Sequence, residues 1–273
     1  MNARAILKFM TPPIFVDLRR RLLGRTLRFS DGPRSWAEAQ EMSTGYSTKD
    51  IFEQVLKATR TVVAGGARYE RDSVLFDEQD FPFPVLAALL RVAATNAGQV
   101  KVLDFGGSLG STYRQCRPFL DCLARIDWWV VEQPAIVAAG RSEFTTSELH
   151  FAEHTADVPQ VTPDTIILAS SVLQYIENPS SIIEEFGRLQ ARHLFIDLTP
   201  MSGESTDRLC VQHVPKHIYR ASYPCWILSR TRLLSLLSQR WRMLSDFSCA
   251  VGPMRTDDGI QFEYRGLILE KKT

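Results

Sequence analysis

The 273-residue chain balances 32 lysine and arginine residues against 31 aspartate and glutamate residues, and this net charge of +1 excludes a global field for nucleic acids or other polyanions. Hydrophobic residues make up 45% of the chain, which predicts a soluble globular protein with a large core. No apolar run approaches the ~20 residues that cross a bilayer. The 5 cysteines are scattered and never in Cys-x-x-Cys spacing, which predicts reduced thiols in a cytoplasmic protein rather than disulfides or a zinc site.

Residues 1–35 are basic, with apolar residues between the charges. Such a segment can lie on an anionic membrane surface, which would make the protein a peripheral membrane binder. A solvated helix packed on the domain, or a partly ordered tail, explains the same pattern. Residues 31–48 are polar and rich in turn formers, and they predict a connection. Asp17 and Asp31 stand against the cations Arg4, Lys8, Arg19, Arg20, Arg21, Arg25, Arg28 and Arg34.

Two helices are expected next. The first begins at Lys49, where apolar residues start to recur on one face, and the second begins after Pro82-Phe-Pro84. Between them, residues 69–77 mix charged and aromatic side chains in a predicted loop. Such a loop is a candidate for substrate or cofactor contact, and a surface cluster of ion pairs is the alternative. Residues 1–97 are therefore predicted to form a helical N-terminal region, followed by a domain that spans residues 98–273.

Residues 100–110 read Val-Lys-Val-Leu-Asp-Phe-Gly-Gly-Ser-Leu-Gly and predict a buried strand that ends in a glycine-rich turn. Gly106, Gly107 and Gly110 permit positive φ and remove the Cβ atoms that would keep a ligand away. A phosphate-binding loop would need a lysine after the last glycine, and a dinucleotide turn would need a glycine in place of Ser108. Asp104, at the strand end, would repel a pyrophosphate, whereas it favours an ammonium or a sulfonium group.

Further strands follow in the order expected for a parallel sheet. Residues 126–131 are continuous and bulky, as in a strand buried on both faces, and they end at Glu132. A carboxylate at this position can accept hydrogen bonds from both hydroxyls of a ribose; a solvent-facing strand end is the alternative. Strands are also expected at 149–151, 164–169, 193–198, 241–247 and 262–269, with helices at 112–123, 135–144 and 230–239 and one that begins near 178.

Two motifs resemble those of class I S-adenosylmethionine-dependent methyltransferases. Asp104-Phe-Gly-Gly-Ser-Leu-Gly110 is similar to their first motif, Asp/Glu-x-Gly-x-Gly-x-Gly, with Ser108 at the middle glycine. Ser170-Ser-Val-Leu-Gln-Tyr-Ile-Glu-Asn-Pro179 is similar to their fourth-motif region, with Gln174 and Tyr175 where histidines are often found. The resemblance covers residues 100–200. It implies an α/β, three-layer Rossmann-like fold with a mostly parallel seven-stranded sheet, and S-adenosyl-L-methionine (SAM) as the cofactor.

The resemblance also implies roles for the donor-site residues. Asp104 would hold the amino end of the methionine moiety, Glu132 would bind the ribose, and Ser170 would line the donor pocket. Backbone approach to the donor would depend on Gly106, Gly107 and Gly110.

Residues upstream of the glycine turn add a second, narrower resemblance. Tyr69-Glu-Arg-Asp-x-Val-Leu-Phe76 and Phe81-Pro-Phe-Pro84 resemble a bacterial family of methyltransferase-like proteins associated with surface-polysaccharide genes. The expected function is therefore methyl transfer to an O or N nucleophile of a small molecule or saccharide, in polysaccharide biosynthesis. A non-catalytic SAM-fold binding module and an NAD-dependent oxidoreductase are the alternatives.

Residues 200–225 are predicted to form a long loop over the site. Methyl transfer to a hydroxyl needs a base, and His213 and His217 are the candidates because histidine titrates near neutral pH. Either imidazole can equally be structural. A metal site built on this pair would need a third ligand, and the sequence identifies none.

Overall fold

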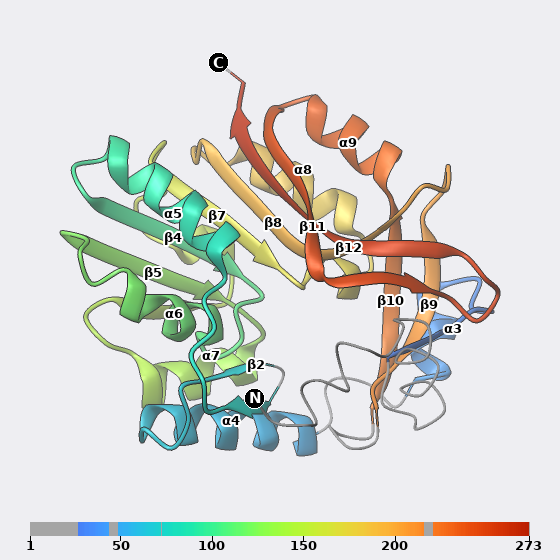
Figure 1. The fold of residues 1–273 in the computed structure, drawn as a ribbon, viewed down its shortest axis with the longest axis horizontal. Coiled ribbons are helices and arrows are strands. Elements are labelled where there is room, and N and C mark those ends of the chain that lie inside the picture. The colour runs from blue at the N-terminus through green and yellow to red at the C-terminus, as the bar shows by residue number, and fades with distance from the viewer. Residues whose placement is uncertain (1–26, 44–48, 72, 216–220, 273) are drawn as a thin grey trace, which may run out of the picture.

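The computed structural model describes residues 27–43, 49–71, 73–215 and 221–272, and Figure 1 shows their arrangement. Within these residues a 10-stranded sheet forms the centre of the molecule, accompanied by a 2-stranded hairpin. Helices cover both faces of the sheet. The predicted α/β, three-layer Rossmann-like fold is confirmed. The basic segment proposed to contact a membrane lies largely outside the described residues, and none of the described helices is long and apolar enough to cross a bilayer.

The middle of the sheet is parallel and runs in the order β6 (Leu149–Ala152), β5 (Arg125–Val131), β4 (Gln99–Phe105), β7 (Thr165–Ser170) and β8 (His193–Ser202). The register pairs Phe105 with Val131 and Asp104 with Leu168. These strands therefore end at nearly the same level, and the residues that follow them gather at one edge of the sheet.

Two antiparallel strands close the far side of this sheet. β12 (Gln261–Lys271) pairs with β8, and β11 (Trp241–Arg255) pairs with β12. Both were predicted, but β11 runs 8 residues past its predicted end at Phe247, through a register shift between Ser248 and Pro253. With the five parallel strands, they make up the seven strands expected from the sequence.

Three further strands extend the sheet beyond this plan. β8 continues to Ser202, where it pairs in parallel with β10 (Ser222–Ser229); β10 pairs with β9 (Arg208–His213), and β9 pairs with β1 (Arg28–Ser30). The prediction of a loop over residues 200–225 is therefore wrong for residues 200–202, 208–213 and 222–225, which lie in β8, β9 and β10. In Figure 1, β9 and β10 stand beyond the tips of the parallel strands, so they face the edge where ligands bind.

Two hydrophobic clusters lie on opposite faces of the sheet. On one face, α5 (Phe83–Thr95), α6 (Ser111–Cys116) and α7 (Pro134–Ala139) pack against one set of alternating strand residues, such as Val102 and Val130. On the other face, α8 (Pro179–Arg188) and α9 (Arg230–Ser238) pack against the alternate strand residues that point the opposite way, such as Leu103. This alternation is what the strand repeat of two requires. Pro118 interrupts the helix expected over 112–123, and η1 (Arg117–Phe119) follows α6 there.

The N-terminal elements pack around the carboxyl edge of the sheet. α4 (Lys49–Val63) buries Ile51 and Val55 in the first cluster. Residues 69–77, predicted as a loop, form the hairpin of β2 (Tyr69–Arg71) and β3 (Val74–Phe76). The short helix α3 (Trp36–Glu41), within the segment predicted as a connection, packs against β9 and β10. The boundary near residue 97 stays a prediction.

Candidate functional site

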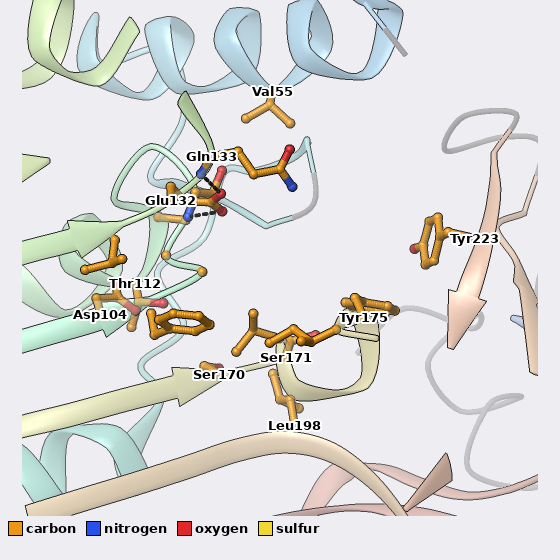
Figure 2. A pocket seen from close by; sticks show the side chains of 18 of the residues that line it. Val55, Asp104, Thr112, Glu132, Gln133, Ser170, Ser171, Tyr175, Leu198 and Tyr223 are labelled. Atoms are coloured by element: carbon orange, nitrogen blue, oxygen red, sulfur yellow. Dashed lines mark hydrogen bonds between the residues drawn. The ribbon is translucent and has the colours of Figure 1, made fainter. Parts of the chain in front are cut away.

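A cavity of about 780 Å³ lies at the carboxyl ends of the parallel strands, between the central sheet and the β9–β10 extension. Asp104, Glu132 and Ser170 line it, and Figure 2 shows their side chains on its wall. Gly106 and Gly107 also line it, whereas Gly110 does not. The structure therefore brings five of the six proposed donor-binding residues together at one cavity.

The glycine turn is sterically fixed. Gly106 has φ +75°, and a Cβ atom there would overlap the side chain of Val172. A Cβ atom on Gly107 would overlap the Asp104 carboxylate, which lies directly against the turn. Gly110 has φ +87° and stands at the N-terminal cap of α6, so its contribution is to the strand-to-helix turn rather than to the cavity wall.

Asp104 is a buried acid at the end of the central strand, with 1% of its surface exposed. The indole nitrogen of Trp128 donates a hydrogen bond to Oδ2 at 2.9 Å. Burial raises the pKa of Asp104 to about 7; the Trp128 hydrogen bond opposes this shift, and the charge of Glu132 adds to it. A buried carboxyl group with one neutral donor is poised to receive a cation.

Glu132 stands at the end of the next strand with its carboxylate held in place. The backbone N–H of Ser108 donates to Oε1 at 3.3 Å, and that of Gln133 donates to Oε2 at 2.8 Å. Burial raises its pKa, while both backbone hydrogen bonds lower it. Because each carboxylate oxygen can accept more than one hydrogen bond, acceptor capacity remains for a ligand.

Strained backbone gathers around the same cavity. Ser108, Ser171 and Leu198 all have positive φ, at 54°, 54° and 47°, and all three line the cavity. Such conformations cost roughly 1–3 kcal/mol each and persist where the surrounding structure fixes them. The Gln174 side chain does so here, because its amide nitrogen donates to Ser171 Oγ and to the Leu198 carbonyl, each at 3.2 Å.

The β2–β3 hairpin brings a cation to the cavity. Arg71 is the one lysine or arginine among the described lining residues, and it donates to Gln115 Oε1 at 3.0 Å. Glu70, next to it, is 4% exposed and accepts hydrogen bonds from Ser111 Oγ and from the backbone N–H of Ser73. The sequence flagged this segment as a candidate for ligand contact, and its position at the cavity agrees with that interpretation.

The end of the cavity farthest from Asp104 is aromatic. Tyr175 follows β7 on η4 (Leu173–Tyr175), and Tyr223 lies on β10. Trp36 and Gln40 of α3 also line the cavity. The sequence placed Tyr175 in its motif and Tyr223 in the segment expected over the site, but it missed α3, because no local signal shows that α3 meets the parallel strands.

The two candidate bases have different outcomes. His213 is the last residue of β9, where its Nε2 lies 2.8 Å from Ser30 Oγ, and burial lowers its pKa. It does not line the cavity, so the structure does not bring it to the donor-site residues. His217 lies outside the described residues, and its role as a base stays a prediction.

No protein-family model and no curated protein matches the chain. Among solved structures, the N-terminal domain of EvdMO1 with SAH and D-fucose matches at 16% identity and a TM-score of 0.45, over 84% of this chain and 99% of that one. The N-methyltransferase NodS from Bradyrhizobium japonicum WM9, in complex with S-adenosyl-L-homocysteine (SAH), matches at 13% identity and 0.44, over 71% and 90%. The [4+2]-cyclase SpnF matches at 15% identity and 0.47, over 89% and 99%. These TM-scores lie below 0.5, so the functional proposal rests on the cavity.

Proposed function

We propose that the cavity binds SAM and that the protein is a methyltransferase acting on an O or N nucleophile of a small molecule or saccharide. The observation that supports this most is the pair of carboxyl groups on neighbouring strand ends, Asp104 and Glu132, with the glycine turn beside both. One is buried under the turn, and the other is held by backbone N–H groups. A role in surface-polysaccharide biosynthesis belongs to the same proposal.

The residues present fit this donor. A volume of about 780 Å³ lies in the range of small-molecule pockets. Asp104 offers a carboxylate to an ammonium group, and Glu132 offers acceptors to ribose hydroxyls. Arg71 is placed to pair with the carboxylate of the methionine moiety. The loop after β6, which contributes His154 to the lining, would flank the adenine.

When bound, SAM supplies a methyl group already activated by its sulfonium. The remaining work belongs to the chain, which must hold donor and acceptor close and aligned. When ionised, Asp104 and Glu132 would place negative charge near a cationic ligand, and their burial would strengthen that attraction. Among the described residues of the segment 200–225, no histidine lines the cavity. In this proposal catalysis therefore rests on alignment, and His217 is the remaining candidate base.

The Asp104 carboxyl group argues against the oxidoreductase alternative. Because a Cβ atom on Gly107 would overlap Asp104, a pyrophosphate laid on this turn would sit against a carboxylate. Calorimetric titration of the full chain with SAH and with NADH tests the choice. We expect SAH to bind and NADH to give no heat. NADH binding without SAH binding would overturn the proposal, and SAM binding without turnover on any acceptor would leave a binding module.

A further inference from the structure

Two tyrosines form a wall at the end of the cavity farthest from Asp104. Tyr175 comes from the η4 turn after β7 and Tyr223 from β10 of the sheet extension, and their rings meet edge to face with centroids 5.0 Å apart at 89°. Figure 2 shows both rings away from Asp104 and Glu132, with Ser171 and Leu198 between the two groups. The wall is therefore separate from the residues assigned to the donor.

A buried glutamine joins the hydroxyl groups of the two tyrosines. Gln212 of β9 lies directly opposite Tyr223 in the β9–β10 ladder and is 3% exposed. The Tyr175 hydroxyl donates to Gln212 Oε1 at 3.2 Å, and Gln212 Nε2 donates to the Tyr223 hydroxyl at 3.4 Å. Because a carboxamide has one accepting and one donating end and each tyrosine hydroxyl can donate or accept, Gln212 can hydrogen-bond both tyrosines at once.

The described residues at this end of the cavity carry no charge. The described lining residues from α3, β8, β10 and the η4 turn are aromatic, apolar, amide or hydroxyl residues. An ionised ligand placed there would lose hydration without gaining a counter-charge. Tyrosine rings instead suit a ring with an apolar face, and the hydroxyl and amide groups suit hydroxyls on its edge.

We propose that Tyr175 and Tyr223 form the acceptor subsite, that it takes an uncharged ring bearing hydroxyl groups, and that Gln212 is the positioning residue that holds the two tyrosines. The proposal rests on the proposed donor function, because an acceptor has to lie beside the donor to receive its methyl group. A pyranose and a phenol share the required chemistry, and the test separates them.

Saturation-transfer NMR on the full chain loaded with SAH measures ring binding. The probes are methyl β-D-glucopyranoside, 4-methoxyphenol and the charged glucose 6-phosphate. We expect saturation of one uncharged ring, little of the phosphate, and loss of the ring signal in Tyr223→Ala and Tyr175→Ala. Gln212→Met, which keeps the shape without the bridge, should weaken ring binding about tenfold while SAH affinity stays unchanged. Tyr264→Phe, a buried tyrosine of β12 outside the cavity, is the control.

Each outcome decides the proposal. A glycoside signal or a phenol signal supports it and names the source of the ring. Absence of both signals on SAH-loaded protein, tighter binding of glucose 6-phosphate, or ring binding that survives Tyr223→Ala with SAH affinity intact would overturn it. If SAH itself does not bind, the donor function fails separately. The same NMR experiment on the free protein then still measures ring binding at Tyr175 and Tyr223.

Discussion

At the scale of single residues, the Glu132 carboxylate is fixed by backbone N–H groups from the glycine turn and from its own following residue. If it also receives two ribose hydroxyls, Glu132→Ala should weaken SAH binding by about 1.5–3 kcal/mol for each hydrogen bond lost. The melting temperature without ligand should change little, since a half-buried strand end is not core. Calorimetry gives the affinity, and Glu184→Ala on the exposed side of α8 is the control. Unchanged affinity in the folded variant would remove Glu132 from the donor site.

Asp104 makes the free protein sensitive to pH. Its pKa in the folded state is raised from 3.8 to about 7, so the folded state binds this proton more tightly than the unfolded state does. The stability that this proton contributes is complete below pH ~4 and is lost as pH rises through about 7. Relative to Asp104→Asn, the unliganded wild type should therefore lose melting temperature between pH 5 and pH 8. Parallel pH profiles of the two proteins would contradict the assignment.

SAH should reverse this trend, because its ammonium group needs the ionised form of Asp104. The rise in melting temperature with saturating SAH should be larger at pH 8 than at pH 6 in the wild type. In Asp104→Asn the rise should be smaller and nearly independent of pH. An equal SAH shift in both proteins at pH 8 would mean that Asp104 does not face the ligand's charge.

The placement of Asp104 and Glu132 at one cavity could be predicted because each stands at the end of a mainly apolar strand. Parallel pairing brings these two strand ends to one edge of the sheet. Gln212 could not be predicted, since its hydrogen-bond partner Tyr175 lies 37 positions away and the bridge depends on three-dimensional pairing. His213 was chosen for its chemistry and for its place in a predicted loop over the site, but the segment forms a strand that places it beside Ser30.

At the scale of elements, the glycine turn has no room for a side chain at its glycine positions. A methyl group at Gly107 would meet the Asp104 carboxylate, which the Trp128 indole holds in place. Gly107→Ala should therefore lower both the melting temperature and SAH affinity. Gly203, where an added Cβ would meet nothing within 4 Å, provides the matched control. Thermal melts with and without SAH check both variants, and a Gly107→Ala protein that behaves like Gly203→Ala would show that the turn can relax.

The β9–β10 pair shows why the sequence predicted a loop rather than strands directly after Leu198. Both strands mix polar and apolar residues, and Pro224 stands inside β10 opposite Val211, where a local pattern indicates a loop. Their stability comes from partners: Cys210, Cys225 and Ile227 are fully buried against Phe29 and β12 residues. Strands of this kind are specified by their neighbours rather than by their own alternation.

At the scale of the whole molecule, the five parallel strands could be predicted because each carries an apolar run, and helical turns follow the first four of them along the chain. What could not be predicted is how the chain's start joins its end. β1 pairs with β9, and the Phe29 carbonyl accepts a hydrogen bond from the backbone N–H of Asp257 at 2.9 Å. Contacts between residues so far apart in sequence leave no periodic trace in either segment.

Phe29 tests whether this junction belongs to one cooperative unit. It is 0% exposed, and its ring meets Phe262 edge to face with centroids 4.9 Å apart. Phe29→Ala should cost about 3–5 kcal/mol of unfolding free energy. Phe83→Ala, at a phenylalanine that is 61% exposed, should cost far less.

Urea unfolding followed by far-UV circular dichroism measures both variants. Because β1 and α3 pack against β9 and β10 while α4 and α5 pack into the main core, we expect one transition whose midpoint falls in Phe29→Ala. SAH affinity below that midpoint should stay near that of the wild type, since Phe29 does not line the cavity. Two separate transitions, with only the first shifted, would show instead that residues 1–97 unfold apart from residues 98–273, along the boundary that the sequence predicts.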